Sequence, residues 1–146
     1  MNYEEFKEEN SKKLQDFIHA NCFWAFGEEA LKKKLDELGL TQEEFQKQYT
    51  DFLGGAIKKD KLAEYKKIRQ EMDKNALEMM KSSKDFAVSA FEYEFGNFEC
   101  FYADRWLEAI AAIGITLEQI NKNKMLLDAY KIAKKKYWDY CIENGF

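Results

Sequence analysis

Three polar side chains, Asn97, Glu99 and Asp104, lie within an aromatic stretch and form the best candidate cluster for metal or acid–base chemistry. Oxygen ligands of this kind hold Mg²⁺, and a bound Mg²⁺ would support phosphoryl transfer or nucleic-acid hydrolysis. Metal-dependent nucleases place such acids at strand ends beside a lysine, however, and the sequence shows no acid-rich strand. We therefore expect the cluster to satisfy backbone groups or to contact a partner, and a hydrolase that depends on Glu99 and Asp104 ranks last.

The other groups capable of chemistry are few. His19 is the only histidine, and it lies near an expected helix end, where the helix dipole favours a cation. The three cysteines, Cys22, Cys100 and Cys141, are far apart and form no CxxC pair, which predicts buried reduced thiols. We expect no catalytic residue, no metal site and no cofactor.

Aromatic side chains are dense between Phe91 and Trp106 and must be buried against the protein's own core or against another molecule. Tryptophan dominates both cores and binding surfaces, so Trp24 and Trp106 fit either role, with the core favoured. The residues that we predict to contact a protein partner are Trp24, Asn97, Glu99, Tyr102, Asp104 and Trp106.

The last expected helix is locally basic, with three successive lysines and interleaved aromatic residues. Surfaces that stack bases and contact phosphates combine these two residue types. Three successive lysines point in three directions on a helix, however, which favours a solvated face. The nucleic-acid-binding alternative rests on Lys131, Lys134, Lys135, Lys136 and Trp138.

Composition indicates one globular domain over residues 1–146. The hydrophobic fraction of 46% supplies a core, and the charged fraction of 34% suits helices with exposed Lys and Glu. The net charge of −4 lacks both the basic excess of a general nucleic-acid binder and the acidic excess of a DNA mimic. No signal-peptide core and no apolar run of ~20 residues is visible, so we expect a cytoplasmic protein.

Apolar spacing and helix-end residues predict a compact, mainly α fold of six to seven helices, with a β element of two or three strands. In the first half, helices are expected at Tyr3–Ile18, at Glu28–Leu38 and from the Thr41–Glu44 capping box through Tyr49 and Phe52 to Gly54-Gly55. The candidate strands are Cys22–Phe26 and Ala56–Lys58.

A long helix capped by Asp60 is expected to end at Ser82-Ser83. The aromatic series that follows allows one continuous helix through Tyr102. Gly96 equally allows a helix that ends there, followed by an extended segment over 98–102.

The last part of the chain carries clear helix-end patterns. Asp104 is the expected cap of a short helix closed by Gly114, and Thr116 with Gln119 forms a second capping box. A final helix carries an apolar stripe up to Tyr140.

Three segments resemble a family of small proteins of unknown function encoded by phages, prophages and plasmids of Gram-positive bacteria. The segments are Phe23–Gly27, Leu53–Leu62 and Glu94–Cys100, the last followed by Ile113–Ile115, and the resemblance spans about Phe17 to Asn121. Family members tend to have glycine at the position of Ala56 and histidine at the position of Phe98. Any shared chemistry that needs this histidine is therefore absent here.

The resemblance implies a mobile genetic element that acts inside a bacterial cell. Small soluble proteins in that setting often inhibit host defence, anti-CRISPR proteins among them. We therefore expect a non-enzymatic phage or prophage protein that binds a bacterial protein stoichiometrically, with a CRISPR nuclease as the expected partner. A nucleic-acid-binding accessory protein that uses the last helix is the alternative.

Overall fold

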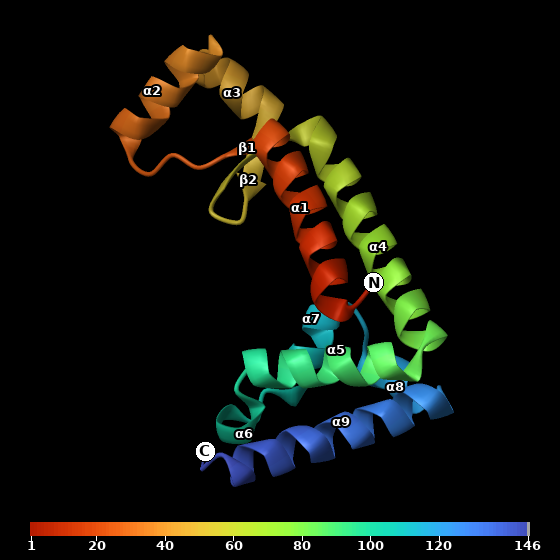
Figure 1. Cartoon of the computed structure of the whole chain (residues 1–146). Helices are drawn as coiled ribbons and strands as arrows, with labels where there is room; N and C mark the ends of the chain where they lie inside the picture. The colour runs from red at the N-terminus through yellow and green to blue at the C-terminus, as the bar shows by residue number, and fades with distance from the viewer. Residues whose placement is uncertain (146) are drawn as a thin grey trace. The chain divides into compact units, whose positions relative to one another are not determined.

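The computed structural model describes residues 1–145, which form nine helices and a small three-stranded antiparallel sheet (Figure 1). The expected mainly α fold with a small β element is thus confirmed. The helix number exceeds the expected six to seven, partly because α6 (Cys100–Ala103) is a separate four-residue helix. Within residues 1–145, no helix combines the length and the apolar content that a membrane span requires.

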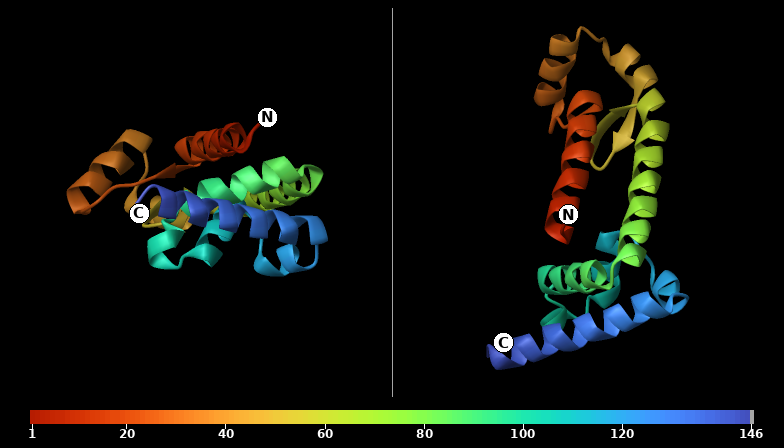
Figure 2. Two further views of the ribbon diagram at one scale, coloured as in Figure 1. Left: turned by 60° about the horizontal axis from the view of Figure 1, so that its bottom comes forward. Right: turned by 45° about the vertical axis from the view of Figure 1, so that its right-hand side comes forward.

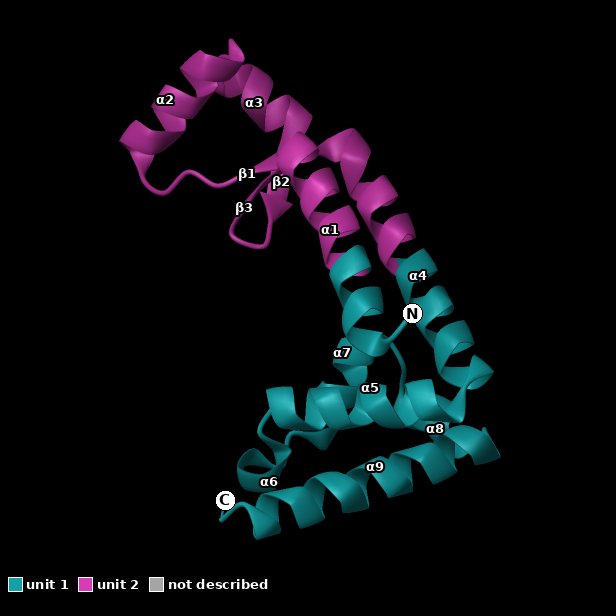
Figure 3. Cartoon of the chain, in the orientation of Figure 1, with its two compact units in different colours: residues 1–9, 70–146 teal, residues 10–69 magenta. Residues whose placement is uncertain are grey.

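The chain divides into two compact units (Figure 3). Unit 1 comprises residues 1–9 and 70–146, and unit 2 comprises residues 10–69. The boundaries fall inside α1 (Tyr3–Asn21) and α4 (Lys59–Ser82). The single domain over residues 1–146 stays a prediction, and each unit is described by itself below.

Unit 2 contains the sheet and two short helices, and its elements begin largely where the sequence predicts them. The elements are β1 (Cys22–Phe23), α2 (Glu28–Leu38), α3 (Gln42–Gln48), β2 (Tyr49–Phe52) and β3 (Gly55–Lys58). Gly39 ends α2 at a φ of 69°, a backbone conformation that favours glycine. The Thr41–Glu44 capping box is present at the start of α3. Of the β-prone run Cys22–Phe26, only the first two residues form a strand.

The expected continuation of α3 through Tyr49 and Phe52 is wrong. This segment is β2, which pairs with β3 across a turn at Leu53 and Gly54, whose φ angles are 51° and 83°. Positive φ at both central residues is the geometry of a two-residue hairpin turn. The spacing of the aromatic residues also fits a helix, but the strand places the Phe52 ring 4.7 Å from the Tyr65 ring.

Unit 1 is built around α5 (Lys84–Asn97) and α9 (Lys124–Glu143), which lie along each other (Figure 2). Three short helices complete it: α6, α7 (Trp106–Ile113) and α8 (Leu117–Asn121). Its fully buried side chains include Phe91, Phe95, Ile120 and Leu126.

Two expected caps are wrong, whereas other helix ends are confirmed. α4 begins at Lys59, so Asp60 lies in the first turn rather than at the cap. Asp104 has a left-handed backbone and closes α6, and Arg105 precedes α7 instead. Gly114 closes α7 as predicted, and Thr116 forms its capping box with the side chain of the third residue of α8.

The segment after Gly96 follows neither expected path completely. α5 ends at Asn97, close to the predicted end. The expected extended segment over 98–102 is wrong, because the chain turns at Phe98 and Glu99 and forms α6. A short helix allows Cys100 to be buried while its neighbour Tyr102 remains exposed.

Candidate functional site

α6 lies beside the C-terminal end of α9 (Figure 1). Four aromatic side chains from these two helices lie near one another there. We call this group, Phe101, Tyr102, Trp138 and Tyr140, the α6–α9 aromatic patch. The Phe101 ring centroid lies 4.6 Å from that of Trp138 and 5.2 Å from that of Tyr102. Tyr102 is 66% exposed, Trp138 43% and Tyr140 57%. These are large apolar surfaces in contact with water.

The backbone of α6 determines how Tyr102 is presented. Glu99 and Asp104, at the two ends of α6, have φ angles of 51° and 50°. A non-glycine residue in this left-handed region costs about 1 kcal/mol. The helix is held from inside, because Cys100 is buried and the Phe101 amide donates a hydrogen bond of 3.2 Å to the Tyr137 hydroxyl oxygen. Tyr102 therefore stands on a fixed but strained turn.

A hollow of about 220 Å³ lies beside the patch. It is lined by Gly96, Glu99, Tyr102, Tyr137, Tyr140 and Cys141. Burial raises the pKa of Tyr137 to about 12, which the hydrogen bond from the Phe101 amide partly offsets and the neighbouring Cys141 reinforces. The Tyr137 phenol is therefore neutral at physiological pH and serves as a hydrogen-bonding group.

Two acidic side chains lie at the ends of α6. Glu99 and Asp104 are exposed, and neither forms an ion pair within the part of the chain that the structure describes. Arg105 is held by Glu108 through a hydrogen bond of 2.8 Å, and this contact lowers the pKa of the Glu108 carboxyl. The Arg105 guanidinium also lies 4.9 Å from the Phe98 ring centroid. Glu99 and Asp104 thus place negative charge without an ion-pair partner at both ends of α6, and Lys134, one turn before Trp138 on α9, is an exposed cation that likewise forms no ion pair among the described residues.

The residues predicted to contact a partner fall in both units. Asn97, Glu99, Tyr102, Asp104 and Trp106 all belong to unit 1, around α6 and the helix ends next to it, whereas Trp24 belongs to unit 2. Trp106 is half-buried, with its ring 4.9 Å from the buried Phe95 ring, so it forms part of the core edge. Phe101 and Tyr140 of the patch were not predicted as site residues. Phe101 contacts Tyr102 and Trp138, and Tyr140 lines a hollow together with Tyr102.

The α9 lysines of the nucleic-acid alternative are partly compensated by neighbours. Lys135 pairs with Asp139 at 2.6 Å, and Lys136 lies 4.0 Å from a Glu92 oxygen. Lys134 lies over the Trp106 ring, 4.4 Å from its centroid. Lys131 remains exposed. Trp138, the aromatic residue of this set, packs on Phe101 and thus joins the patch formed with Tyr102.

Trp24 in unit 2 lies against the β2–β3 hairpin. Its indole Nε1 donates to the Leu53 carbonyl oxygen at 3.2 Å, and its ring centroid is 6.3 Å from that of Phe52. A Cβ atom at Gly55 would lie 2.6 Å from both the Phe23 carbonyl oxygen and the Trp24 Nε1. The Trp24 indole therefore packs so closely on Gly55 that a larger residue there would clash with it. Despite this contact, 39% of Trp24 is exposed.

A buried carboxylate that the sequence analysis did not single out lies in unit 1. Glu94 is fully buried, and its two oxygens accept hydrogen bonds of 2.7 and 3.2 Å from the Lys7 ammonium. The Tyr3 hydroxyl also donates to Glu94, and burial together with this carboxylate raises the pKa of Tyr3 far above its usual value. This network joins the first turns of α1 to α5 within unit 1.

The remaining candidate groups are dispersed. His19 is exposed in the last turn of α1, and the three cysteines are free, with Cys100 and Cys141 buried as expected and Cys22 half-buried. Over residues 1–145, no group of three or more His, Cys, Asp or Glu side chains is arranged to hold a metal ion.

Comparison with protein-family models matches residues 2–136 to the model described as "Family of unknown function (DUF7659)". No curated protein and no solved structure matches the chain.

Proposed function

The chain belongs to the family of unknown function DUF7659, and from the geometry of its surface we propose that it is a stoichiometric protein-binding protein. The α6–α9 aromatic patch is its docking surface. The protein covers a functional surface of a bacterial protein and thereby inhibits it, as an accessory protein of a mobile genetic element. The mobile-element setting comes from the resemblance of Phe23–Gly27, Leu53–Leu62 and Glu94–Cys100 described above.

The exposed aromatic residues of the patch carry this proposal. Single exposed apolar side chains are ordinary on protein surfaces, whereas a contiguous group marks an interaction site. Tyr and Trp are the residues that most often dominate binding energy, because they supply a large contact area with few rotatable bonds. Tyr102 and Trp138, linked through Phe101, fit this role.

The charge around the patch indicates the chemistry of the partner. Glu99 and Asp104 form an acidic rim, and unit 1 as a whole has 11 basic and 17 acidic residues, a balance of −6. Complementary potentials favour association with a basic surface. Basic surfaces are typical of enzymes that bind nucleic acid, so a nucleic-acid-cleaving defence enzyme such as a CRISPR nuclease suits this patch.

The test is an inhibition titration. Purified CRISPR nucleases from Gram-positive hosts, with their guide RNA, are assayed for DNA cleavage at increasing ratios of the protein to the nuclease. We expect cleavage by a susceptible nuclease to stop near one equivalent, because a tight binder titrates its target. The double variant Tyr102→Ala/Trp138→Ala should need at least 30-fold more protein, since one hot-spot aromatic contributes about 2 kcal/mol.

Leu117→Ala is the matched control. Leu117 is also an exposed apolar residue of unit 1, but it lies on α8, which packs elsewhere along α9 than α6 does. The Leu117→Ala variant should inhibit the nuclease as strongly as the wild type does. Failure of the protein to inhibit or to bind any nuclease of the panel would overturn the choice of partner. Equal inhibition by the wild type and the double variant would overturn the docking surface.

A further inference from the structure

The net charge of the chain is distributed unequally along its length. Unit 2 has 12 basic and 10 acidic residues, a balance of +2, against −6 in unit 1. The excess of unit 2 is concentrated at 58–69, the end of β3 and the first half of α4, with six basic and two acidic residues. The whole-chain charge of −4 conceals this basic segment.

Most cations of this segment have no acidic partner. Lys61 pairs with Glu64 at 3.2 Å. The other five are exposed and form no ion pair within residues 1–145: Lys58, Lys59, Lys66, Lys67 and Arg69. Two of the α9 lysines, Lys135 and Lys136, differ in this respect because they have acidic neighbours.

Helix geometry brings three of these cations to one side of α4. Lys59, Lys66 and Arg69 are seven and three residues apart, so at about 3.6 residues per turn they fall within about 80° around the helix axis and along a rise of about 15 Å. The two acids of the segment, Asp60 and Glu64, lie about 100° or more around the helix from each of these three cations.

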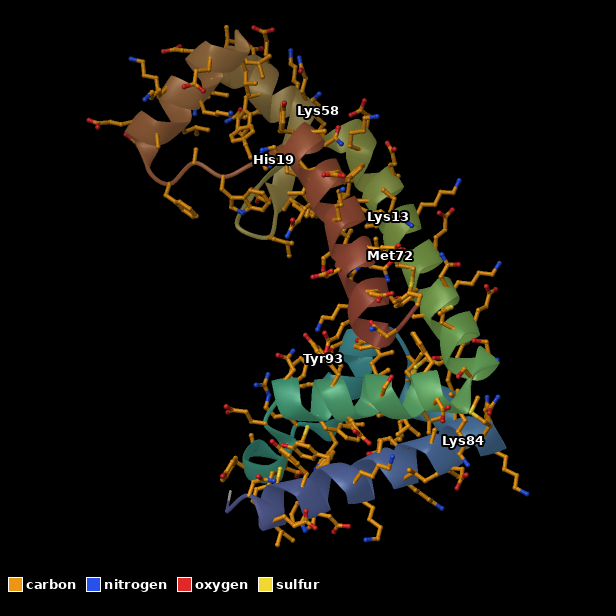
Figure 4. The ribbon with its side chains drawn as sticks, in the orientation of Figure 1. Lys13, His19, Lys58, Met72, Lys84 and Tyr93 are labelled. Carbon is orange, nitrogen blue, oxygen red and sulfur yellow. The ribbon has the colours of Figure 1, made fainter. Side chains whose placement is uncertain are left out.

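The stability of the fold gives no reason for lysines at the start of α4. Lys58 lies where β3 gives way to α4 (Figure 4), and Lys59 is the first residue of that helix. The positive end of the helix dipole disfavours cations there. Lys59 also borders a hollow of about 490 Å³ in unit 2, so its side chain is not covered by the sheet.

We propose that Lys59, Lys66 and Arg69, the α4 basic stripe, bind the phosphate backbone of nucleic acid. Unpaired cations at this spacing can each neutralise a separate phosphate, and release of condensed counterions drives such binding. The contact is to the backbone, so it carries no base specificity. It is independent of the proposed docking patch, which lies in unit 1.

The test is fluorescence anisotropy of the full-length protein with labelled 20-nucleotide single-stranded and 20-base-pair duplex DNA. With three phosphates neutralised, affinity for duplex should fall roughly 40-fold between 50 and 200 mM salt. The triple variant Lys59→Gln/Lys66→Gln/Arg69→Gln should lose at least tenfold in affinity at 50 mM salt and should show a flatter salt dependence. Circular dichroism confirms that each variant is folded.

The matched control is Lys134→Gln/Lys135→Gln/Lys136→Gln on α9, which removes the same charge from another helix. It should retain affinity within about threefold. Equal losses in both triple variants would show a general charge effect and overturn the proposal, and so would an absence of DNA binding at 50 mM salt. Binding of the wild type to phosphatidylserine vesicles without binding to DNA would assign the stripe to a membrane surface and also overturn it.

Discussion

At the scale of single residues, Glu94 is the side chain whose burial most requires a compensating partner. A fully buried carboxylate is stable only when its charge is compensated, and here the Lys7 ammonium and the Tyr3 hydroxyl provide that compensation. Removal of the ammonium leaves an unpaired buried charge. The consequence should be measurable as a loss of stability.

Lys7→Met should lower the free energy of unfolding by about 1–3 kcal/mol, less than for a fully buried pair because the Lys7 side chain is 35% exposed. Denaturant unfolding followed by circular dichroism measures the loss. Lys135→Met breaks the exposed pair with Asp139 instead and should leave the unfolding midpoint unchanged. Equal midpoints for wild type and Lys7→Met would show that Glu94 needs no cation.

Two tyrosines predict the behaviour at alkaline pH. Burial raises the pKa of Tyr137 to about 12 and raises that of Tyr3 as well, so the native state holds both phenols protonated where the unfolded state loses the proton near pH 10. The unfolded state then binds fewer protons, and stability falls as pH rises from 10 towards 12. Tyr137→Phe should flatten this decline in unfolding free energy measured between pH 8 and 11.5. An equally steep decline in the variant would contradict the assignment.

At the scale of elements, the sequence predicts helix ends better than the paths between them. Gly39, Gly114 and the capping boxes at Thr41 and Thr116 act through neighbours in the chain, and these predictions are confirmed. β2 was not predicted because its strand conformation depends on pairing with β3. The aromatic spacing up to Phe52, taken alone, also fits a helix.

The candidate site shows the same division between local and tertiary information. Tyr102 was predicted from its aromatic surroundings, and Trp138 was predicted for another function. Their association through Phe101 depends on the left-handed backbone at Glu99 and Asp104. Neither residue type indicates this conformation, so it could not be predicted from the sequence. The ion pair of Lys135 with Asp139 was not predicted, although the two residues are four positions apart on one helix, a local spacing that favours such a pair.

The β2–β3 turn gives a prediction at this scale. Leu53 has a φ of 51° in a hairpin turn that favours Asn-Gly, and it is 75% exposed. Leu53→Asn should therefore stabilise the protein by about 1 kcal/mol, seen as a higher thermal unfolding midpoint. Leu107→Asn, at an exposed leucine within α7, should not raise it. A lower midpoint for Leu53→Asn would contradict the assigned turn.

At the scale of the whole molecule, the two units carry different surfaces. Unit 1 combines a negative balance with the α6–α9 aromatic patch, and unit 2 combines a positive balance with the α4 basic stripe. Taken together, the two proposals describe a protein that engages an enzyme and its nucleic acid through separate surfaces. Each surface can be removed by two or three substitutions without altering the other, so their contributions are separable.

Hydrogen–deuterium exchange tests the central claim, that the α6–α9 aromatic patch docks on a protein partner, most directly. Amide exchange of the free protein is compared with that of the protein bound to a nuclease it inhibits. We predict at least tenfold slower exchange in the complex for peptides that cover residues 98–104 and 137–143. Unchanged exchange in both peptides, with protection only elsewhere in the chain, would contradict the account.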